Sequence, residues 1–414
     1  MAHLKRSIGI SLWFMFLTLP LMVVRVNTIN NEVEWRWSNM LWVGVCSFAL
    51  AWLWQFSTER RAARREADKA AAQPAVEKVT FAQRLADDPV LSKRLLLVAA
   101  AIGLAFPWLV STGTNFYHVN VMVSALILVV LGLGLNITVG LAGLLDLGYI
   151  AFFAVGSYTY ALLSKNFDLG FWTCLPLGGL MGMLFGIVLG FPILRLRGDY
   201  LAIVTLGFAS ITKIVLENWD TVFGGAAGIA NIPRPELFGM ALDGRQKAVY
   251  SYYIVLALVG ITILVTTRLK NSRIGRAWMA LREDEIACVA MGVDMARTKL
   301  SAYALGAFWA GLVGVIFAAH NSFINPDSFT FMDSAMILAM VVLGGMGSIL
   351  GVIIASLALK LLPEYLRTFA EYRMLVFGAV MVLMMIFRPQ GLISNMRRKY
   401  DLSAVKKGKT DGSK

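Results

Sequence analysis

Charged residues are scarce in this chain. Asp, Glu, Lys and Arg make up only 15% of its 414 residues, whereas hydrophobic residues make up 58% and the mean hydropathy is +0.69. Soluble domains carry about 25% charged residues, so the composition excludes an ordinary soluble globular protein. Because the apolar runs have the length of membrane helices, the sequence predicts an all-α polytopic membrane protein.

The residues that most enzymes depend on are also few. The chain has no GxxxxGK[ST] phosphate loop, no nucleophile motif and no paired His/Cys spacing that would suit a metal. Its three histidines are far apart in the sequence, and its three cysteines form neither a disulfide framework nor a metal motif. The sequence therefore predicts no cofactor, no metal and no enzymatic activity, and in particular no ATP hydrolysis by this chain itself.

The formal net charge of +13 is the one strong imbalance in the composition. A basic excess can attract nucleic acid, but here it gathers at the ends of apolar runs, where it orients spans in a bilayer. We therefore expect contact with membrane lipid and no binding of nucleic acid.

The N-terminal part of the chain contains two apolar runs, residues 8–24 and 39–56. The first resembles a signal sequence without a small-residue cleavage site, so it is interpreted as a retained anchor. Residues 1–56 are thus predicted to form an N-terminal pair of spans, and residues 57–94 a charged cytoplasmic linker. The main membrane-spanning core is expected over residues 95–392, followed by a basic disordered tail over 393–414.

The core contains nine apolar segments: 95–111, 119–139, 143–163, 171–194, 199–216, 249–267, 300–319, 334–362 and 372–387. The run 334–362 is too long for one span and is interrupted by GGMGS at 344–348. Its second half, 350–362, would be roughly 20 Å long as a helix, which is too short to cross about 30 Å of hydrocarbon. The sequence therefore predicts a broken, re-entrant hairpin and a total of about ten to twelve membrane segments.

Splitting that run places both termini in the cytoplasm. The cytoplasmic loops and termini then hold 28 Lys and Arg, against 7 on the outer side. This asymmetry follows the positive-inside rule and favours the split.

Glycines mark two breaks in the apolar core that run in the same direction through the membrane. We expect these glycines to form hinges along the transport path, with close helix packing as the alternative explanation. The first break contains Gly140, Gly143 and Gly148, and the second contains Gly344, Gly345 and Gly347.

The only long polar segment between strongly apolar blocks covers residues 271–299. Its apolar spacing predicts one helix over 277–292 that ends at Gly292, followed by a second helix capped by Asp294. We expect its charged side chains to face a partner protein, whereas a basic loop resting on lipid headgroups is the alternative. The predicted contact residues are Ala277, Leu281, Arg282, Glu283, Asp284, Glu285, Ile286, Ala287, Val289 and Gly292.

Three ionisable residues lie within or at the edge of apolar spans: Asp146, Lys213 and Glu217. Such residues are costly in a membrane and often functional. Lys213 and Glu217 are four residues apart and can pair on one helix face. Asp146 is therefore the candidate carboxylate for an ion-driven mechanism.

Five strings occur in order between residues 121 and 392: GLLDLGYIAFFAVGSYTYALL, FPILRLRGDYLAIVTLGF, ALREDEIACVAMGV, LAMVVLGGMGSILG and MIFRPQGL. Together they resemble the LivM-type permeases of bacterial branched-chain amino acid ABC importers. The resemblance implies an inner-membrane subunit that pairs with a LivH-like permease, two ABC ATPase subunits and a periplasmic amino acid-binding protein. Segment 271–299 would then be the ATPase-coupling loop, similar to the EAA loop of importers, although Gly292 lies one residue further from Glu285 than in the general motif.

Two other functions remain open on the sequence. A related permease for another small solute, such as urea or an amide, would have a similar sequence. A secondary transporter driven by ions would need intramembrane carboxylates along its path, for which Asp146 is the candidate.

Overall fold

The computed structural model divides the chain into two units, Met1–Val79 and Thr80–Lys414. In the second unit it describes residues 103–108, 117–193, 196, 198–235, 244–365, 378–379, 382 and 391–392. In the first it describes residues 24–27, 32–35 and the single positions 9, 11, 13, 15, 18, 44, 45, 47 and 48. Two predicted parts of the chain, the linker 57–94 and the tail 393–414, therefore lie outside the described residues. Of the last predicted span, 372–387, only residues 378, 379 and 382 are described.

The N-terminal unit contains an antiparallel ribbon that the sequence analysis did not predict. Strand β1 (Val24–Asn27) pairs with β2 (Glu32–Trp35) between the two expected spans. Described residues of both expected spans are helical and touch one another, because Ser11 Oγ donates to the carbonyl of Gly44 at 2.9 Å. The first apolar run thus ends in a strand at Val24 and not in a helix.

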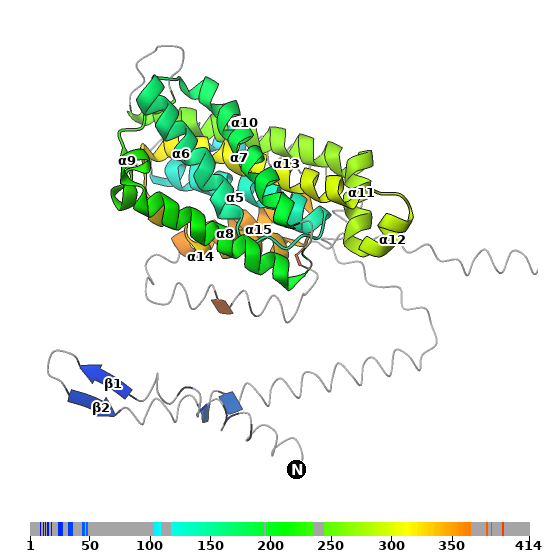
Figure 1. The fold of residues 1–414 in the computed structure, drawn as a ribbon. Helices are drawn as coiled ribbons and strands as arrows, with labels where there is room; N and C mark the ends of the chain where they lie inside the picture. The colour runs from blue at the N-terminus through cyan, green and yellow to red at the C-terminus, as the bar shows by residue number, and fades with distance from the viewer. Residues whose placement is uncertain are drawn as a thin grey trace, which may run out of the picture. The chain divides into compact units, whose positions relative to one another are not determined.

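The second unit is a bundle of helices (Figure 1). Its long helices are α5 (Tyr117–Leu135), α6 (Tyr149–Phe167), α7 (Phe171–Ile193), α8 (Asp199–Asn218), α10 (Gly244–Asn271) and α13 (Met295–Asn321). Shorter ones are the π-helical segment η1 (Asn136–Leu141), α9 (Asp220–Phe223), α11 (Arg273–Glu283), α12 (Glu285–Ala290), α14 (Phe331–Gly344) and α15 (Ile349–Tyr365). The remaining elements are two 3₁₀ turns, η2 (Gly225–Ala227) and η3 (Pro326–Ser328), and the strands β3 (Ile229–Ala230) and β4 (Phe323–Ile324), which pair with each other.

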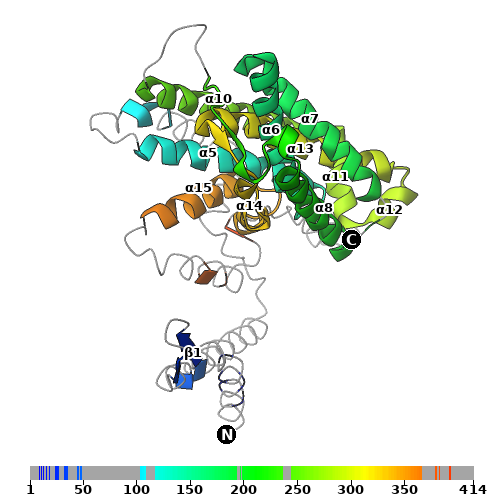
Figure 2. The ribbon, with the colours of Figure 1, turned by 60° about the vertical axis from the view of Figure 1, so that its left-hand side comes forward.

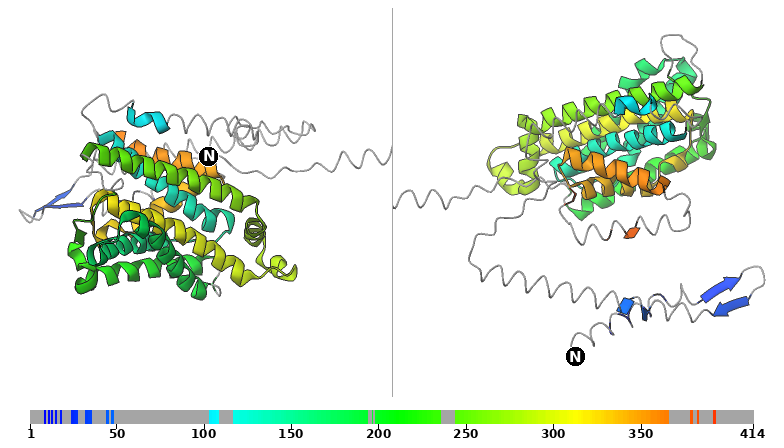
Figure 3. Two further views of the ribbon diagram at one scale, coloured as in Figure 1. Left: turned by 90° about the horizontal axis from the view of Figure 1, so that it is seen from above. Right: turned by 180° about the vertical axis from the view of Figure 1, so that it is seen from behind.

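Six helices among the described residues are long and apolar enough to cross a membrane. This confirms the polytopic all-α class, while the total of ten to twelve segments stays a prediction. The long helices run alongside one another (Figure 3), and α14 lies beside α15 (Figure 2). The second half of the broken hairpin was predicted over 350–362, but α15 continues to Tyr365 and has 17 residues, about 26 Å of helix.

Burial separates an inner from an outer set of helices. The apolar windows of α13 and α5 are 83% and 78% buried, whereas that of α8 is only 28% buried. Large aliphatic side chains such as Ile203 and Leu264 are exposed on the outer helices. A polar solvent would penalise so much exposed apolar surface, so these faces are suited to lipid.

Small residues allow α6, α7 and α13 to pack backbone against backbone. A Cβ atom added to Gly156 of α6 would collide with the carbonyl of Gly311 on α13, and one added to Gly311 would collide with the carbonyl of Gly178 on α7. Close approach through glycine is the usual basis of helix association in a membrane, where burial of apolar surface gives little driving force. This packing fixes α13 at the centre of the bundle.

Candidate functional site: two helix breaks and the helix pair of the polar segment

The first break follows α5, where the helix widens into η1 and then leaves helical geometry until α6 begins. Gly143 has a φ of +73°, a conformation that side chains with a Cβ rarely adopt. The free backbone groups are satisfied locally: Asp146 Oδ1 accepts from Gly148 N at 2.8 Å, and Leu147 N donates to Thr205 Oγ1 on α8 at 3.0 Å. Irregular backbone in a membrane protein survives where protein encloses it, and η1 is fully buried here.

The second break lies between α14 and α15. Gly345 and Gly347 have φ values of +103° and +83°, so both positions need glycine to adopt this turn without strain. A Cβ atom on Gly344 would lie 2.6 Å from the backbone of Gly351, so the two halves of the hairpin approach closely here. The predicted interruption at residues 344–348 is therefore confirmed as a true break in helical structure.

The two breaks touch one another although 211 residues separate them in the sequence. Gly347 N donates to the side-chain oxygen of Asn136 at 2.8 Å. A Cβ atom on Gly140 would lie 2.6 Å from Gly347 N, so bulk on this side of η1 would force the breaks apart. The two predicted breaks thus meet at Gly140 and Gly347, two of the six glycines that were predicted as hinges.

Two basic side chains, one at the end of α10 and one on α11 of the polar segment, donate hydrogen bonds to this contact. Arg282 Nη1, at the end of α11, donates to the carbonyl of Gly140 at 2.6 Å. Lys270 Nζ, at the end of α10, donates to the carbonyl of Gly347 at 3.1 Å. Each break therefore has its own hydrogen bond from the region of residues 270–282, and both bonds carry a formal positive charge on the donor.

The polar segment is folded as two helices and not as the single helix predicted over 277–292. Asp284 interrupts it, because its carboxylate accepts from the backbone N–H groups of Ile286 and Ala287 and so caps α12. The first helix also begins earlier than the predicted residue 277, because α11 starts at Arg273 and its N-cap is Ser272. Gly292 ends the second helix at a φ of +81° as predicted.

Buried contacts fasten this helix pair to α13. Trp278 is fully buried, and its indole N–H donates to the carbonyl of Thr298 at 3.0 Å. Lys299, only 1% exposed, forms an ion pair of 2.7 Å with Glu285. Asp294 caps α13 by accepting from Arg297 N, as the sequence predicted. The helix pair α11–α12 is thus attached directly to the central helix α13.

The charged side chains of this segment make contacts within the chain that the sequence did not predict. Of the four side chains expected to face a partner, Arg282 is bonded to the first break, Asp284 caps α12 and Glu285 pairs with Lys299. Arg282, Glu283 and Asp284 are nevertheless exposed. That these charges face a partner protein stays a prediction.

Apolar side chains form most of the exposed surface of α12 and of the residue that follows it. Ile286, Val289 and Met291 are 72%, 52% and 84% exposed, whereas Cys288 is buried. This helix pair lies at one end of α10 and α13, and α9 lies at the opposite end of the bundle (Figure 1). Neighbouring exposed apolar side chains on a short helix are typical of a protein contact surface.

Several residues of this site were missed from the sequence: Asn136, Lys270, Trp278 and Lys299. Asn136 carried a usable signal, because it is a lone amide in a long apolar run. Of the ionisable residues that were noted, Lys213 does pair with Glu217 at 3.2 Å and also bonds Asp327 at 3.0 Å. Asp146 is buried in the first break, where it holds the turn.

Comparison with known proteins places these features in a family. The family described as branched-chain amino acid transport system / permease component matches residues 117–385. The high-affinity branched-chain amino acid transport permease LivM of Escherichia coli K12 is 47% identical over 76% of this chain and 78% of its own length. LivM of Salmonella typhimurium is 46% identical over the same shares.

A second permease of the same transport system is also similar. LivH of Escherichia coli K12 is 25% identical over 64% of this chain and 90% of its own length. No solved structure matches the chain.

Proposed function

Because this chain belongs to the family of permease components of branched-chain amino acid transport systems, we propose that it imports leucine, isoleucine and valine across the bacterial inner membrane as one membrane subunit of an ABC importer. The observation that carries the proposal is the 47% identity to LivM over most of both chains. Identity at this level over 337 residues supports a shared substrate class as well as a shared fold.

The importer would contain a second permease, two ATPase subunits and a periplasmic binding protein. The similarity of this chain to LivH supports a pair of homologous permeases. This sequence contains no phosphate-binding loop, which supports partner ATPase subunits as the source of energy for uphill transport.

The geometry supports a route for that energy. An ATPase that docks on Ile286 and Val289 would move α12, and the buried ion pair would carry this movement to α13. Arg282 and Lys270 would carry it to the carbonyls of Gly140 and Gly347, one in each break. Closing of the ATPase pair would then separate or realign the two breaks at the cytoplasmic end of the path, a hinge movement about glycines.

Uptake of labelled leucine tests the proposal. In a cell without its own branched-chain importers, this chain expressed with the partner genes should concentrate leucine, and omission of the ATPase genes should abolish uptake. Accumulation by vesicles that contain this chain alone, driven by a proton or sodium gradient, would instead establish a secondary transporter. Uptake of urea or an amide without competition by leucine would instead establish a permease for another small solute.

A further inference from the structure

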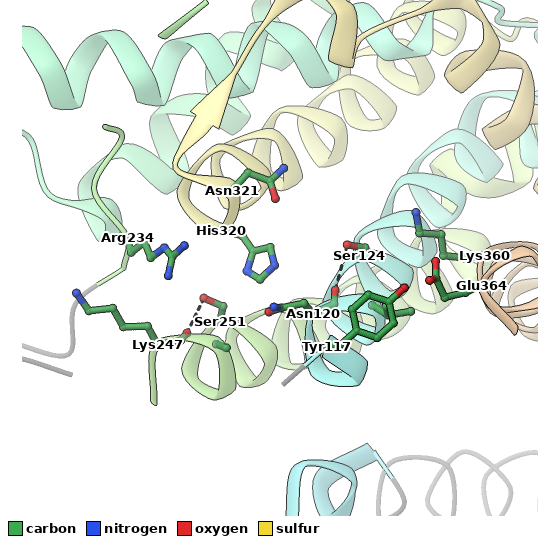
Figure 4. A pocket seen from close by; sticks show the side chains of 12 residues that line it. Tyr117, Asn120, Ser124, Arg234, Lys247, Ser251, His320, Asn321, Lys360 and Glu364 are labelled. Atoms are coloured by element: carbon green, nitrogen blue, oxygen red, sulfur yellow. Dashed lines mark hydrogen bonds between the residues drawn. The ribbon is translucent and has the colours of Figure 1, made fainter. Parts of the chain in front are cut away.

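A cavity of about 540 Å³ lies at the end of the bundle opposite the helix pair of the candidate site (Figure 4). It forms where α5 and α10 begin and α13 ends, beside the last turns of α15. The charged residues of its lining are Arg234, Lys247, Lys360 and Glu364. Lys360 and Glu364 are four residues apart on α15 and contribute one charge of each sign, so the excess of positive charge comes from Arg234 and Lys247.

Arg234 and Lys247 have unused hydrogen-bond donors. Arg234 is exposed, and among the described residues only its Nε atom has a partner, Ser322 Oγ at 3.0 Å. Lys247 is half-buried, and in the described part of the chain its Nζ atom makes no hydrogen bond and no ion pair. Figure 4 shows both side chains on the same side of His320. Guanidinium and ammonium groups are the usual protein ligands of phosphate, so a phosphate group suits this cavity.

A groove of about 300 Å³ adjoins the charged cavity between α5 and α15. Tyr117, Val121 and Glu364 line both the cavity and the groove. The other residues that line the groove are apolar except for one histidine: Phe106, His118, Met122 and Leu361. The groove therefore has a mainly apolar lining and is continuous with a site for an anion.

The elements that form the groove also carry exposed apolar side chains. Leu104 and Trp108, on the helical segment 103–108 that contributes Phe106, are 56% and 79% exposed. Leu362 on α15 is exposed as well. Large apolar side chains on the outside of a membrane bundle are suited to lipid tails, so the groove lies on a surface that lipid can reach.

The cavity and the groove lie at the depth of lipid headgroups. Three candidate spans have an end here: Tyr117 begins the first, Lys247 is the second residue of another, and His320 is the last but one of the third. From Tyr117 to Met122, α5 rises about 8 Å, so the groove leads from the headgroup level into the upper part of the hydrocarbon. Tyrosine, tryptophan and basic residues are typical of this interface.

We propose that the cavity and the groove together bind one anionic phospholipid. Arg234 and Lys247 donate hydrogen bonds to the oxygens of its phosphate, and one acyl chain lies in the groove against Val121, Met122 and Leu361. A zwitterionic lipid would bring an ammonium group into a cavity that already has an excess of positive charge, so an anionic headgroup fits better. The bound phosphate would also join the loop that contains Arg234 to the first turn of α10.

The leaflet that supplies this lipid follows from the proposed function. In that function the helix pair α11–α12 faces the cytoplasm, so the opposite end of the bundle faces the outer leaflet of the inner membrane. Only the choice of leaflet rests on the proposed function, because the lipid itself is inferred from the cavity and the groove.

Titration with a short-chain lipid tests the charged cavity. Dioctanoyl phosphatidylglycerol is added to the importer purified in detergent, and native mass spectrometry measures the affinity of the first lipid that binds. Arg234→Gln and Lys247→Gln should each weaken this affinity about tenfold, as expected for the loss of one hydrogen bond between charged groups.

Lys165→Gln is the matched control for the loss of charge. Lys165 is exposed in the last turn of α6 and lines neither the cavity nor the groove. Helix α6 reaches the same end of the bundle, because Tyr160 donates to the carbonyl of Pro233 beside Arg234. This variant should bind phosphatidylglycerol as tightly as the unaltered protein, since a general attraction to surface charge is not what holds the lipid.

The groove is tested by filling it. Leu361→Trp places a larger side chain in the groove and should weaken the binding of dioctanoyl phosphatidylglycerol about tenfold, because the acyl chain loses its place. Leu362→Trp is the matched control, since Leu362 is the next residue of α15, is exposed and does not line the groove. Its affinity for the lipid should be unchanged.

Two further ligands identify what the site binds. Dioctanoyl phosphatidylethanolamine should bind at least tenfold more weakly than phosphatidylglycerol, because its ammonium group meets Arg234 and Lys247. Inorganic phosphate in equal concentration should not displace the lipid, because it has no acyl chain for the groove. Displacement by phosphate would show a site for a free anion and would overturn the proposal.

The remaining outcomes separate this inference from the proposed function. Equal affinity of the unaltered protein, Arg234→Gln and Lys247→Gln for phosphatidylglycerol would overturn the lipid site. So would an unchanged lipid affinity in Arg234→Gln together with weaker binding of the periplasmic binding protein, since the cavity would then hold a protein side chain. Failure of the importer to concentrate leucine, with the lipid selectivity retained, would refute the proposed function alone. If Leu361→Trp does not reach the membrane, the two charge variants decide.

Discussion

The ion pair between Glu285 and Lys299 leads to a quantitative prediction about how firmly α12 is held against α13. Lys299 is 1% exposed and Glu285 23% exposed, and their charged atoms are 2.7 Å apart. Glu285→Gln would leave the lysine charge buried without its partner. Breaking a buried pair in this way costs about 3–5 kcal/mol, and the partial exposure of Glu285 places this case near the lower end, about 3 kcal/mol.

This loss of free energy would destabilise a helix that has little stability of its own. Helix α12 has only six residues, and helices so short do not persist without tertiary contacts. We therefore expect Glu285→Gln to shift the equilibrium between docked and undocked α12 by about 3 kcal/mol towards the undocked state. The population of the undocked state should then rise roughly a hundredfold.

Cys288 provides the assay, because it lies on α12 and is only 6% exposed. Its rate of modification by a thiol reagent, followed by mass spectrometry of the peptide that contains it, reports opening of α12. This rate should rise roughly a hundredfold in Glu285→Gln. Glu283→Gln is the matched control, because Glu283 is exposed and precedes the cap of α12.

Exchange of the two charges tests whether the pair itself is responsible. Glu285→Lys combined with Lys299→Glu should restore slow modification of Cys288. An unchanged rate in Glu285→Gln would refute the reasoning, since it would mean that α12 is held by its apolar contacts alone.

Four further outcomes are expected. Arg282→Met removes the 2.6 Å hydrogen bond to the first break, so leucine uptake should fall at least tenfold while partner ATPases still co-purify; normal uptake would show that this bond does not transmit movement. Gly345→Val places a β-branched residue at a φ of +103°, so uptake should be lost although the protein still inserts, as measured by immunoblot of membranes. Ile286→Asp puts a charge on the exposed surface of α12, so co-purification of the ATPases should weaken; full recovery would place docking elsewhere. A reporter active only in the periplasm, fused after Lys399, should be silent, and a strong signal there would contradict the cytoplasmic C-terminus.

Local chemistry explains which features could be predicted from the sequence. Apolar runs of membrane length predicted the described helices, and the glycines at 344–348 predicted a real break, because glycine adopts positive φ at little cost. Gly292 and Asp294 were assigned correctly as a helix end and a cap, since both act on backbone within a few residues.

Partners that are distant in the chain could not be predicted. The sequence did not show that Arg282 donates to the carbonyl of Gly140, or that Glu285 pairs with the side chain of Lys299. Asp284 ended a helix that the apolar spacing predicted as continuous, because a capping carboxylate outweighed that spacing.

The sequence by itself determined the class, the membrane helices, the two breaks and the polar segment, since each depends on composition or on contacts between near neighbours. Only the tertiary structure decided that the two breaks meet, that Arg282 of α11 and Lys270 of α10 each donate a hydrogen bond to one of them, and that Glu285 pairs with Lys299. The Asn136 side chain and the backbone N–H of Gly347 are far apart in the sequence. They meet because glycines let the backbones approach closely, and such pairings are invisible to any local pattern.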